Sequence, residues 1–165
     1  MNRRCMLGLT AVGVIGYCAG GIARADETVK FRAFMHATSV QTQEVGDVDG
    51  HVLGLARVSG LASFPDGSVG TTYFTATTDY IKGAGTNSSY ASVTLKDGSV
   101  LWYKVTGTAK PDGTTTIFPE GQLSVLGGKG KFEGAKGDGT WSGTRLAPFA
   151  TGADLYFDYV INVKK

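Results

Sequence analysis

The sequence predicts an all-β protein, an eight-stranded antiparallel up-and-down β-barrel with a central cavity. Threonine, valine, tyrosine and phenylalanine, which favour strands, recur in alternating runs after the first 25 positions. Asp-Gly pairs, a strong hairpin signal, separate these runs at Asp66-Gly67 and Asp97-Gly98. No stretch carries a sustained helical period with caps. Because the runs are long and most connections short, a closed barrel without exposed edges is favoured over a sandwich of short strands.

The first four strands are expected over residues 28–40, 50–63, 68–80 and 89–96. In the first strand, Val29, Phe31 and Met35 share one face, which we expect to look into the barrel. The second strand contains Gly54 and Gly60, which fit the bends of a coiled strand or a close approach of another backbone. Residues 82–88, rich in glycine, serine and asparagine, are expected to form a longer loop.

The last four strands are expected over residues 99–109, 114–126, 139–146 and 153–164. Pro111-Asp112-Gly113 predicts the turn between the first two of these strands. In the final strand, Leu155, Phe157 and Tyr159 share the face expected to point inward. An eight-stranded barrel has an interior that side chains just fill or that holds one small ligand. A ligand-binding interior predicts a pocket of several hundred Å³.

Residues 1–25 are expected to be a secretory signal peptide, and residues 26–165 a single β-barrel domain. Arg3 and Arg4 precede an apolar run, and Ala-Arg-Ala at 23–25 is a cleavage signal. The expected location is therefore secreted or periplasmic, with no stable membrane span after cleavage. The paired arginines also suit the twin-arginine export route, and the choice between this route and the general one stays open.

Cleavage changes the chemistry available to the chain. It removes Cys5 and Cys18, so no disulfide, cysteine nucleophile or thiolate metal site is expected in the barrel. It also removes three of the 16 basic residues and none of the 14 acidic ones, so the formal charge falls from +2 to −1. A chain with this balance lacks the electrostatic footprint of a nucleic-acid-binding protein, and we expect no nucleic-acid partner.

A glycine-rich segment comes after the sixth expected strand. Its marked positions are Gly127, Gly128, Gly130, Phe132 and Gly134. The spacing fits neither a Walker loop nor a dinucleotide fingerprint, and residues 135–140, with two further glycines, cannot open a regular helix. We therefore interpret the segment as a structural turn in which Phe132 is buried as an anchor.

The same segment carries a family resemblance. Residues 123–137 have the pattern L-x-V-x-G-G-x-G-x-F-x-G-A-x-G, and the last strand of the chain is rich in aromatic residues. This resembles allene oxide cyclases and dirigent proteins, which are calycin-type β-barrels. The resemblance implies a barrel with an apolar cavity, often assembled as a trimer, that steers an isomerisation, cyclisation or coupling without a cofactor. The acidic residue that cyclases carry on the first strand has no counterpart in residues 29–40, so no catalytic residue is transferred.

These observations leave two functions. The first is a barrel that binds a small apolar or aromatic molecule and directs a reactive intermediate, because positioning alone can lower a barrier substantially. The second is a non-catalytic envelope or interaction protein that uses the barrel as a scaffold. Whether the chain is an enzyme stays open at this point.

The candidate ligand-binding residues are one cation and three aromatic residues on the strands: Arg57, Tyr73, Trp102 and Tyr156. Aromatic side chains that face inward would line a pocket with apolar area and a polar handle. Arg57 shares a face with leucines, so it is either a buried cation that needs an anionic partner or an ordinary surface arginine. His36 is a weak candidate for a general base if it points into the barrel. His51 is expected at the barrel rim, exposed to solvent.

Metal and hydrolase chemistry have little support in the sequence. Neither histidine lies in an H-E-x-x-H motif, so no metal site is expected. A carboxylate pair for glycoside hydrolysis stays open, since Asp79, Glu120 and Asp158 could converge in space.

Overall fold

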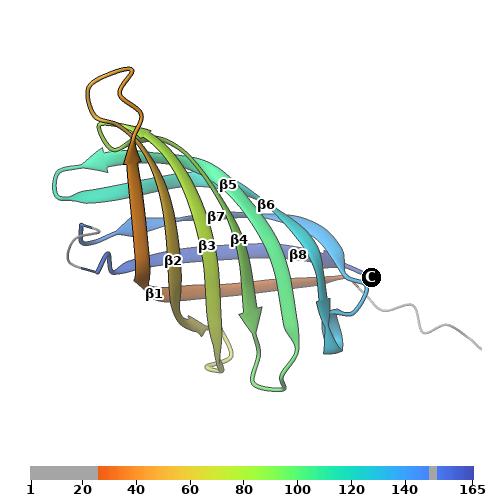
Figure 1. Cartoon of the computed structure of the whole chain (residues 1–165). Coiled ribbons are helices and arrows are strands. Elements are labelled where there is room, and N and C mark those ends of the chain that lie inside the picture. Colours follow the sequence, from red (N-terminus) through yellow and green to blue (C-terminus); the bar gives the residue numbers. More distant parts are fainter. Residues whose placement is uncertain (1–25, 149–151) are drawn as a thin grey trace, which may run out of the picture.

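The computed structural model describes residues 26–148 and 152–165, which form a closed barrel of eight antiparallel strands in up-and-down order (Figure 1). The strands are β1 (Glu27–Glu44), β2 (His51–Ser63), β3 (Val69–Ile81), β4 (Ala84–Thr94), β5 (Val100–Asp112), β6 (Thr115–Lys129), β7 (Lys136–Arg145) and β8 (Leu155–Lys164). The predicted fold class is confirmed. The predicted leader, 1–25, lies outside the described residues. Within them, no helix has the length and apolar character needed to span a membrane.

Strand β1 closes the barrel. It pairs with β8 from Glu27 opposite Val163 to Met35 opposite Leu155, and with β2 along its other edge. A register shift after Ala37 bends the strand, and the rest of β1 continues to pair with β2. The loop 45–50 between β1 and β2 therefore stands at the barrel end that also carries the β3–β4, β5–β6 and β7–β8 connections (Figure 1).

Two turns at the opposite end share one design. In the β2–β3 turn, the Asp66 carboxylate accepts the Ser68 backbone N–H at 2.9 Å, and Gly67 has a φ of 81°. In the β4–β5 turn, Asp97 accepts the Ser99 backbone N–H at 2.9 Å. The aspartate satisfies the turn amide and glycine takes the left-handed conformation, which is why Asp-Gly predicted both turns.

The segment 82–88 corrects the sequence prediction of a long loop. Strand β4 begins at Ala84, and β3 and β4 are joined by a tight turn at Lys82 and Gly83. Both turn residues have positive φ, 51° and 82°, as a two-residue hairpin turn requires. The serines and asparagine that suggested a loop instead lie within β4, where Asn87 and Ser89 face the interior. Pairing with the neighbouring strands therefore overrides their weak β-propensity.

The interior follows the alternation expected for β1 and β8. Val29, Phe31 and Met35 are buried on β1, and Leu155 and Phe157 are buried on β8. Aromatic rings then run along the barrel axis: Phe31 stacks on Tyr159 with ring centroids 4.7 Å apart, and Phe157 lies 5.0 Å from Trp141.

The glycine segment closes one end of this core. It forms the connection between β6 and β7, with a short 3-10 turn at Gly130–Phe132. Phe132 is fully buried. Gly128 has no room for a side chain, because an added Cβ would lie 2.5 Å from the Phe132 Cβ. The Ser99 hydroxyl accepts the Lys131 backbone N–H at 3.0 Å and ties this turn to the β4–β5 turn. Phe132 therefore fills this end of the interior.

Candidate functional site

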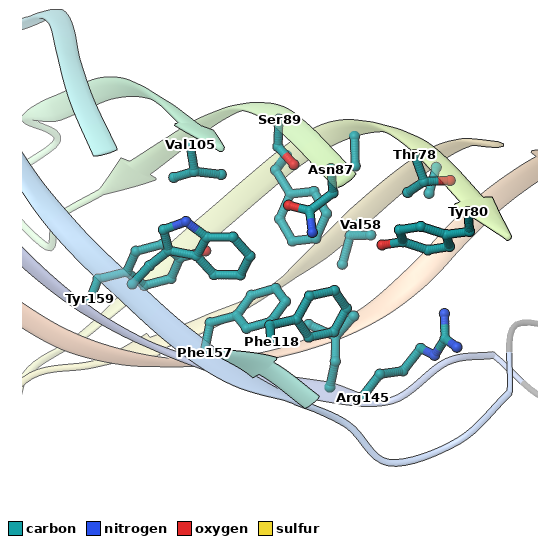
Figure 2. Close-up of a pocket in the computed structure, with 15 residues that line it drawn as sticks. Val58, Thr78, Tyr80, Asn87, Ser89, Val105, Phe118, Arg145, Phe157 and Tyr159 are labelled. Atoms are coloured by element: carbon teal, nitrogen blue, oxygen red, sulfur yellow. The ribbon is translucent and has the colours of Figure 1, made fainter. Parts of the chain in front are cut away.

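A cavity lies inside the barrel, and Figure 2 shows the side chains that line it. Its lining includes Tyr80 beside the β3–β4 turn, so it lies toward the end opposite the β6–β7 connection that holds Phe132. One wall is aromatic and consists of Phe74, Phe118, Trp141, Phe157 and Tyr159. The other wall is formed mainly by β2, β3 and β4 and is lined by small and polar side chains, which include Ala56, Val58, Ala76, Thr78 and Ser89. The cavity therefore combines apolar surface with a few convergent polar groups, as small-molecule sites do.

The cavity is smaller than predicted. Its free volume is about 40 Å³, enough for a few water molecules but not for an aromatic ring. The expected pocket of several hundred Å³ is thus wrong for this conformation. The physical reason is that large rings project into a narrow barrel: the Phe118 ring centroid is 5.8 Å from that of Trp141 and 5.2 Å from that of Phe157.

Polar groups gather at the mouth of the cavity. Arg145 is the last residue of β7, and its Nη2 donates to the Thr116 hydroxyl at 2.7 Å. Its guanidinium lies on the same side of the cavity as Tyr80 (Figure 2). Asn87 is 8% exposed, and its amide nitrogen has no well-aligned hydrogen-bond partner within the described part of the chain, although its side chain lies close enough to the Tyr80 hydroxyl to interact with it. A buried amide without a well-aligned partner carries a free-energy cost, which a ligand oxygen in the cavity would relieve.

The electrostatics of the mouth favour hydrogen-bond donors over bases. Burial raises the pKa of Tyr80, and the neighbouring Asn87 side chain partly offsets this. Burial lowers the pKa of Arg145, which Tyr80 partly opposes, and a guanidinium remains charged at neutral pH. Among the described residues, no carboxylate, histidine or lysine lines the cavity. The mouth therefore presents a protonated phenol, an amide and a cation to an oxygen atom that carries negative charge.

The inner end of the cavity is occupied by a second phenol. Tyr159 is buried, which raises its pKa well above the ordinary value, and the adjacent Tyr103 raises it further. The Tyr103 and Tyr159 ring centroids are 5.5 Å apart. Nearby, the Trp141 indole N–H already donates to the Thr106 carbonyl at 3.1 Å, so it is fixed as part of the wall. This region supplies apolar surface and uncharged hydroxyls.

Three of the four predicted ligand-binding residues lie together, but on the outer surface. Arg57, Tyr73 and Trp102 line a groove on the outer face of β1 to β6. Tyr73 is 56% and Trp102 44% exposed. Arg57 is thus the surface arginine of the two alternatives, because the β2 face that it shares with Leu53 and Leu55 points outward.

Tyr156 and His36 also lie outside the cavity. Tyr156 is on the outward face of β8, where Arg32 lies 5.2 Å from its ring centroid. The His36 side chain is 57% exposed, with its Nδ1 2.9 Å from an oxygen of Asp154. The role of general base required His36 to point into the barrel, and the structure places it on the outer face of β1.

His51 lies at the rim, but it is less exposed than predicted. Its side chain is 15% exposed, because its Nδ1 is 2.5 Å from Asp47 and its Nε2 is 2.9 Å from Asp79. Hydrogen bonds to Asp79 and then Asp47 raise the pKa of His51. Two carboxylates accept from both ring nitrogens only when the imidazole is protonated. His51 therefore fastens the loop 45–50 to β3.

The three carboxylates considered for glycoside hydrolysis do not line the cavity. Asp158 receives two hydrogen bonds from Arg32, both 2.7 Å, on the outer face of β8. Asp79 is held by His51, and Glu120 lies on β6. Within residues 26–148 and 152–165, no group of three or more histidine, cysteine or acidic side chains is placed to hold a metal ion.

The barrel resembles two solved structures of dirigent proteins. It matches the pterocarpan synthase dirigent protein GePTS1 with a TM-score of 0.51 and 14% sequence identity, over 95% of this chain and 100% of that chain. It matches the pterocarpan synthase dirigent protein PsPTS1 with a TM-score of 0.53 and 15% identity, over 86% and 96% of the two chains. The fold is that of the dirigent proteins. No protein-family model matches the chain. Comparison with curated proteins also gives no match.

Sequence reasoning missed the polar residues of this cavity, namely Tyr80, Asn87 and Arg145. Tyr80 lies an even number of residues from Ala76 on β3, so the phase of alternation places it inward. The predicted strand 68–80 already contained Tyr80, so alternation from the small residue Ala76 is the signal that could have found it. Asn87 and Arg145 were hidden by the incorrect loop at 82–88 and by the proximity of Arg145 to a strand end.

Proposed function

We propose that this dirigent-like barrel binds a small aromatic molecule at its open end and directs the cyclisation or coupling of a reactive phenolic intermediate without a cofactor. The observation that carries the proposal is the cavity mouth, where Tyr80, Asn87 and Arg145 converge beside an aromatic wall. The dirigent fold supports it, since the two similar structures are described as pterocarpan synthase dirigent proteins.

The chemistry assigned to the site is orientation and charge stabilisation. A phenolate or quinone-type oxygen at the mouth would accept from the Asn87 amide and the Tyr80 hydroxyl, and Arg145 would stabilise negative charge as it develops. The aromatic wall would hold the carbon skeleton in one conformation and exclude water. Holding the reacting atoms in one geometry can supply several kcal/mol of a barrier without an acid or base.

Binding requires the cavity to open. Because the free volume is about 40 Å³, a ring can enter only if side chains at the mouth turn outward. Arg145 and Phe118 are the natural movable groups, since each lies near a strand end at the open side of the barrel. Ligand binding would thus select a minor, wider conformation, which lowers the apparent affinity by the fraction of molecules that are open.

Thermal unfolding in the presence of simple monophenols, from phenol to 4-propylphenol, tests the proposal. A ligand at about 100 times its Kd stabilises the folded state by about 2.7 kcal/mol, so binders raise the Tm measurably. The Asn87→Leu variant keeps the side-chain size but removes the amide. We expect it to be at least as stable as the wild type and to bind phenols more weakly.

Thr72→Val is the matched control, because Thr72 is also a fully buried polar residue but lies outside the cavity lining. It should leave phenol binding unchanged. If no phenol raises the Tm of the wild type, the ligand-binding function is rejected. The alternative, a non-catalytic scaffold in the cell envelope, is then favoured, and the small cavity is the observation that supports it.

We further propose that the chain forms a homotrimer through an apolar face on β1, β2 and β8. Phe34 pairs with Leu61 on one side and Tyr156 on the other, and the first two are 55% and 56% exposed. Contiguous exposed apolar side chains of this kind mark interaction surfaces. Native mass spectrometry should give a trimer for the wild type and a monomer for the double variant Phe34→Ser and Leu61→Ser. A monomeric wild type would reject this assembly.

We also propose that the barrel works outside the cytoplasm, in the periplasm or medium, after cleavage behind Ala25. The support is the leader pattern of residues 1–25 alone. N-terminal sequencing of the protein recovered from its native compartment should begin at Asp26. Recovery of the intact leader on a cytoplasmic protein would reject the proposal.

A further inference from the structure

A second surface with binding chemistry lies on the outer wall of the barrel, independent of the cavity. It is a groove of about 550 Å³ on the outer face of β1 to β6. Three exposed aromatic side chains border it: Tyr73 at 56%, Tyr90 at 61% and Trp102 at 44%. Aromatic side chains rarely gather on an exposed wall unless the surface binds something, because each leaves apolar area in contact with water.

The strand register fixes how these aromatic residues are spaced. Tyr73 and Trp102 both pair with Ser92, one from each side, so two strand spacings of about 4.8 Å each separate their backbones. Tyr90 lies two residues further along the same face of β4. The rings therefore border a floor that is longer than one six-membered ring, which suits a chain of rings rather than one small molecule.

The floor and the edges of the groove are polar. Hydroxyl groups come from Thr38, Ser59, Thr75 and Ser92, and none of the lining residues is acidic. Two cations stand beside the aromatic rings. Arg57 lines the groove, and the Lys104 ammonium lies 5.5 Å from the Tyr90 ring centroid. The groove thus offers ring faces, hydroxyls and positive charge together.

We propose that this outer groove binds the sugar rings of an acidic polysaccharide. A sugar ring has a C–H face that packs on an aromatic ring, and a hydroxyl edge that exchanges hydrogen bonds with serine and threonine. Carboxylates on the sugar would pair with Arg57 and Lys104 through charge-assisted hydrogen bonds. Each class of side chain in the groove then has a partner on the ligand.

Two other occupants fit less well. A second copy of the chain would bury Arg57 and the hydroxyl floor, whereas the cores of protein interfaces are depleted in charged residues. The apolar face around Phe34 and Leu61 is better suited to self-association. Single-stranded nucleic acid also stacks on aromatic residues, but it requires a positively charged groove that follows the backbone, and this groove has two cations.

Trp102 provides a direct optical test. The chain has two tryptophans, and Trp141 is buried in the cavity wall at 3% exposure. In the Trp141→Phe variant, emission reports on the groove alone. We expect alginate, a polyuronate, to shift this emission and to protect Trp102 from quenching by acrylamide. If acrylamide cannot quench Trp102 in the bare protein, another copy already covers the groove and the proposal is overturned.

Affinity measurements on the otherwise wild-type chain complete the test. Trp102→Ala should weaken alginate binding about tenfold, the loss of one aromatic contact. Arg57→Gln should weaken it by roughly three- to tenfold and reduce its dependence on salt. The control is Ile117→Ala with Lys110→Gln, which removes an exposed apolar–cation pair from β5 and β6, away from the groove and from the proposed trimer face, and should leave binding unchanged.

The remaining outcomes overturn the proposal. Equal binding of uncharged dextran would refute the role given to the two cations. Tighter binding of oligo(dT) than of alginate would assign the groove to single-stranded nucleic acid. Failure of the wild type to bind alginate in both assays would reject the site. None of these results bears on the phenol experiments, because Trp102 and Arg57 lie outside the cavity lining and the Trp141→Phe chain is used only for the emission measurement.

Discussion

Replacing Phe132 by alanine tests the claim that the glycine turn closes the barrel with an anchored ring. Phe132 is fully buried, and a buried phenylalanine removes roughly 150–200 Å² of apolar surface from water. At about 25 cal/mol per Å² this corresponds to roughly 4 kcal/mol, part of which the alanine methyl retains. The cavity left behind adds to the loss, because Gly128 and the surrounding strands cannot collapse into it. We therefore expect a destabilisation of about 3–5 kcal/mol.

Urea unfolding followed by circular dichroism measures this loss. The matched control is Phe34→Ala, the same chemical change at a side chain that is 55% exposed on the outer face. It should cost about 1 kcal/mol or less, measured at a protein concentration where both variants have the same oligomeric state. A loss below about 1 kcal/mol for Phe132→Ala, or equal losses for the two variants, would show that the ring does not anchor the closed end.

Three further predictions concern other parts of the barrel. Gly121→Ala should cost about 1–3 kcal/mol and shift the emission of Trp141, because the new methyl group would collide with the indole nitrogen; unchanged emission would refute this. The raised pKa of His51 makes its stabilisation complete below its unfolded value of about 6.5 and lost as pH rises through the folded value. The stability difference between the wild type and His51→Gln should therefore be larger at pH 5 than at pH 9. If the two proteins differ in urea midpoint by the same amount at both pH values, the prediction is contradicted. Lys82→Asn should raise the free energy of unfolding by a few tenths of a kcal/mol, and the urea midpoint with it, since asparagine tolerates the positive φ better and the exposed ion pair with Asp49 contributes little; a lower midpoint would show that this ion pair matters.

The fold was predictable because turn chemistry and alternation act locally. Asp66 and Asp97 each satisfy the backbone of their own turn, so their turns can be located without knowledge of the rest of the chain. The error at 82–88 has the opposite cause. Lys82 takes a positive φ that lysine rarely adopts, and the strand after it is held by pairing with β3 and β5. Such long-range support leaves no local signal.

The candidate site was less predictable because a shift of one position along a strand moves a side chain from the inner face of the barrel to the outer face. Arg57, Tyr73 and Trp102 were chosen for their chemistry, and they do lie together, but in the outer groove. The cavity instead uses Tyr80 and Asn87, which lie on the inward phase of the neighbouring strands. Alternation shows which residues of β3 share a face, but both faces carry aromatic and threonine side chains, so the sequence does not say which face points inward.

A single sheet wall separates the cavity from the groove, and β3 serves both. Phe74 faces the cavity, while its neighbours Tyr73 and Thr75 border the groove. A slip of β3 by one residue would move Phe74 outward and place Tyr73 and Thr75 in the core. Both surfaces therefore depend on the same register, which the Asp66-Gly67 turn at one end and the Lys82-Gly83 turn at the other hold in place. The turns that made the fold recognisable therefore also align the cavity lining with the outer groove.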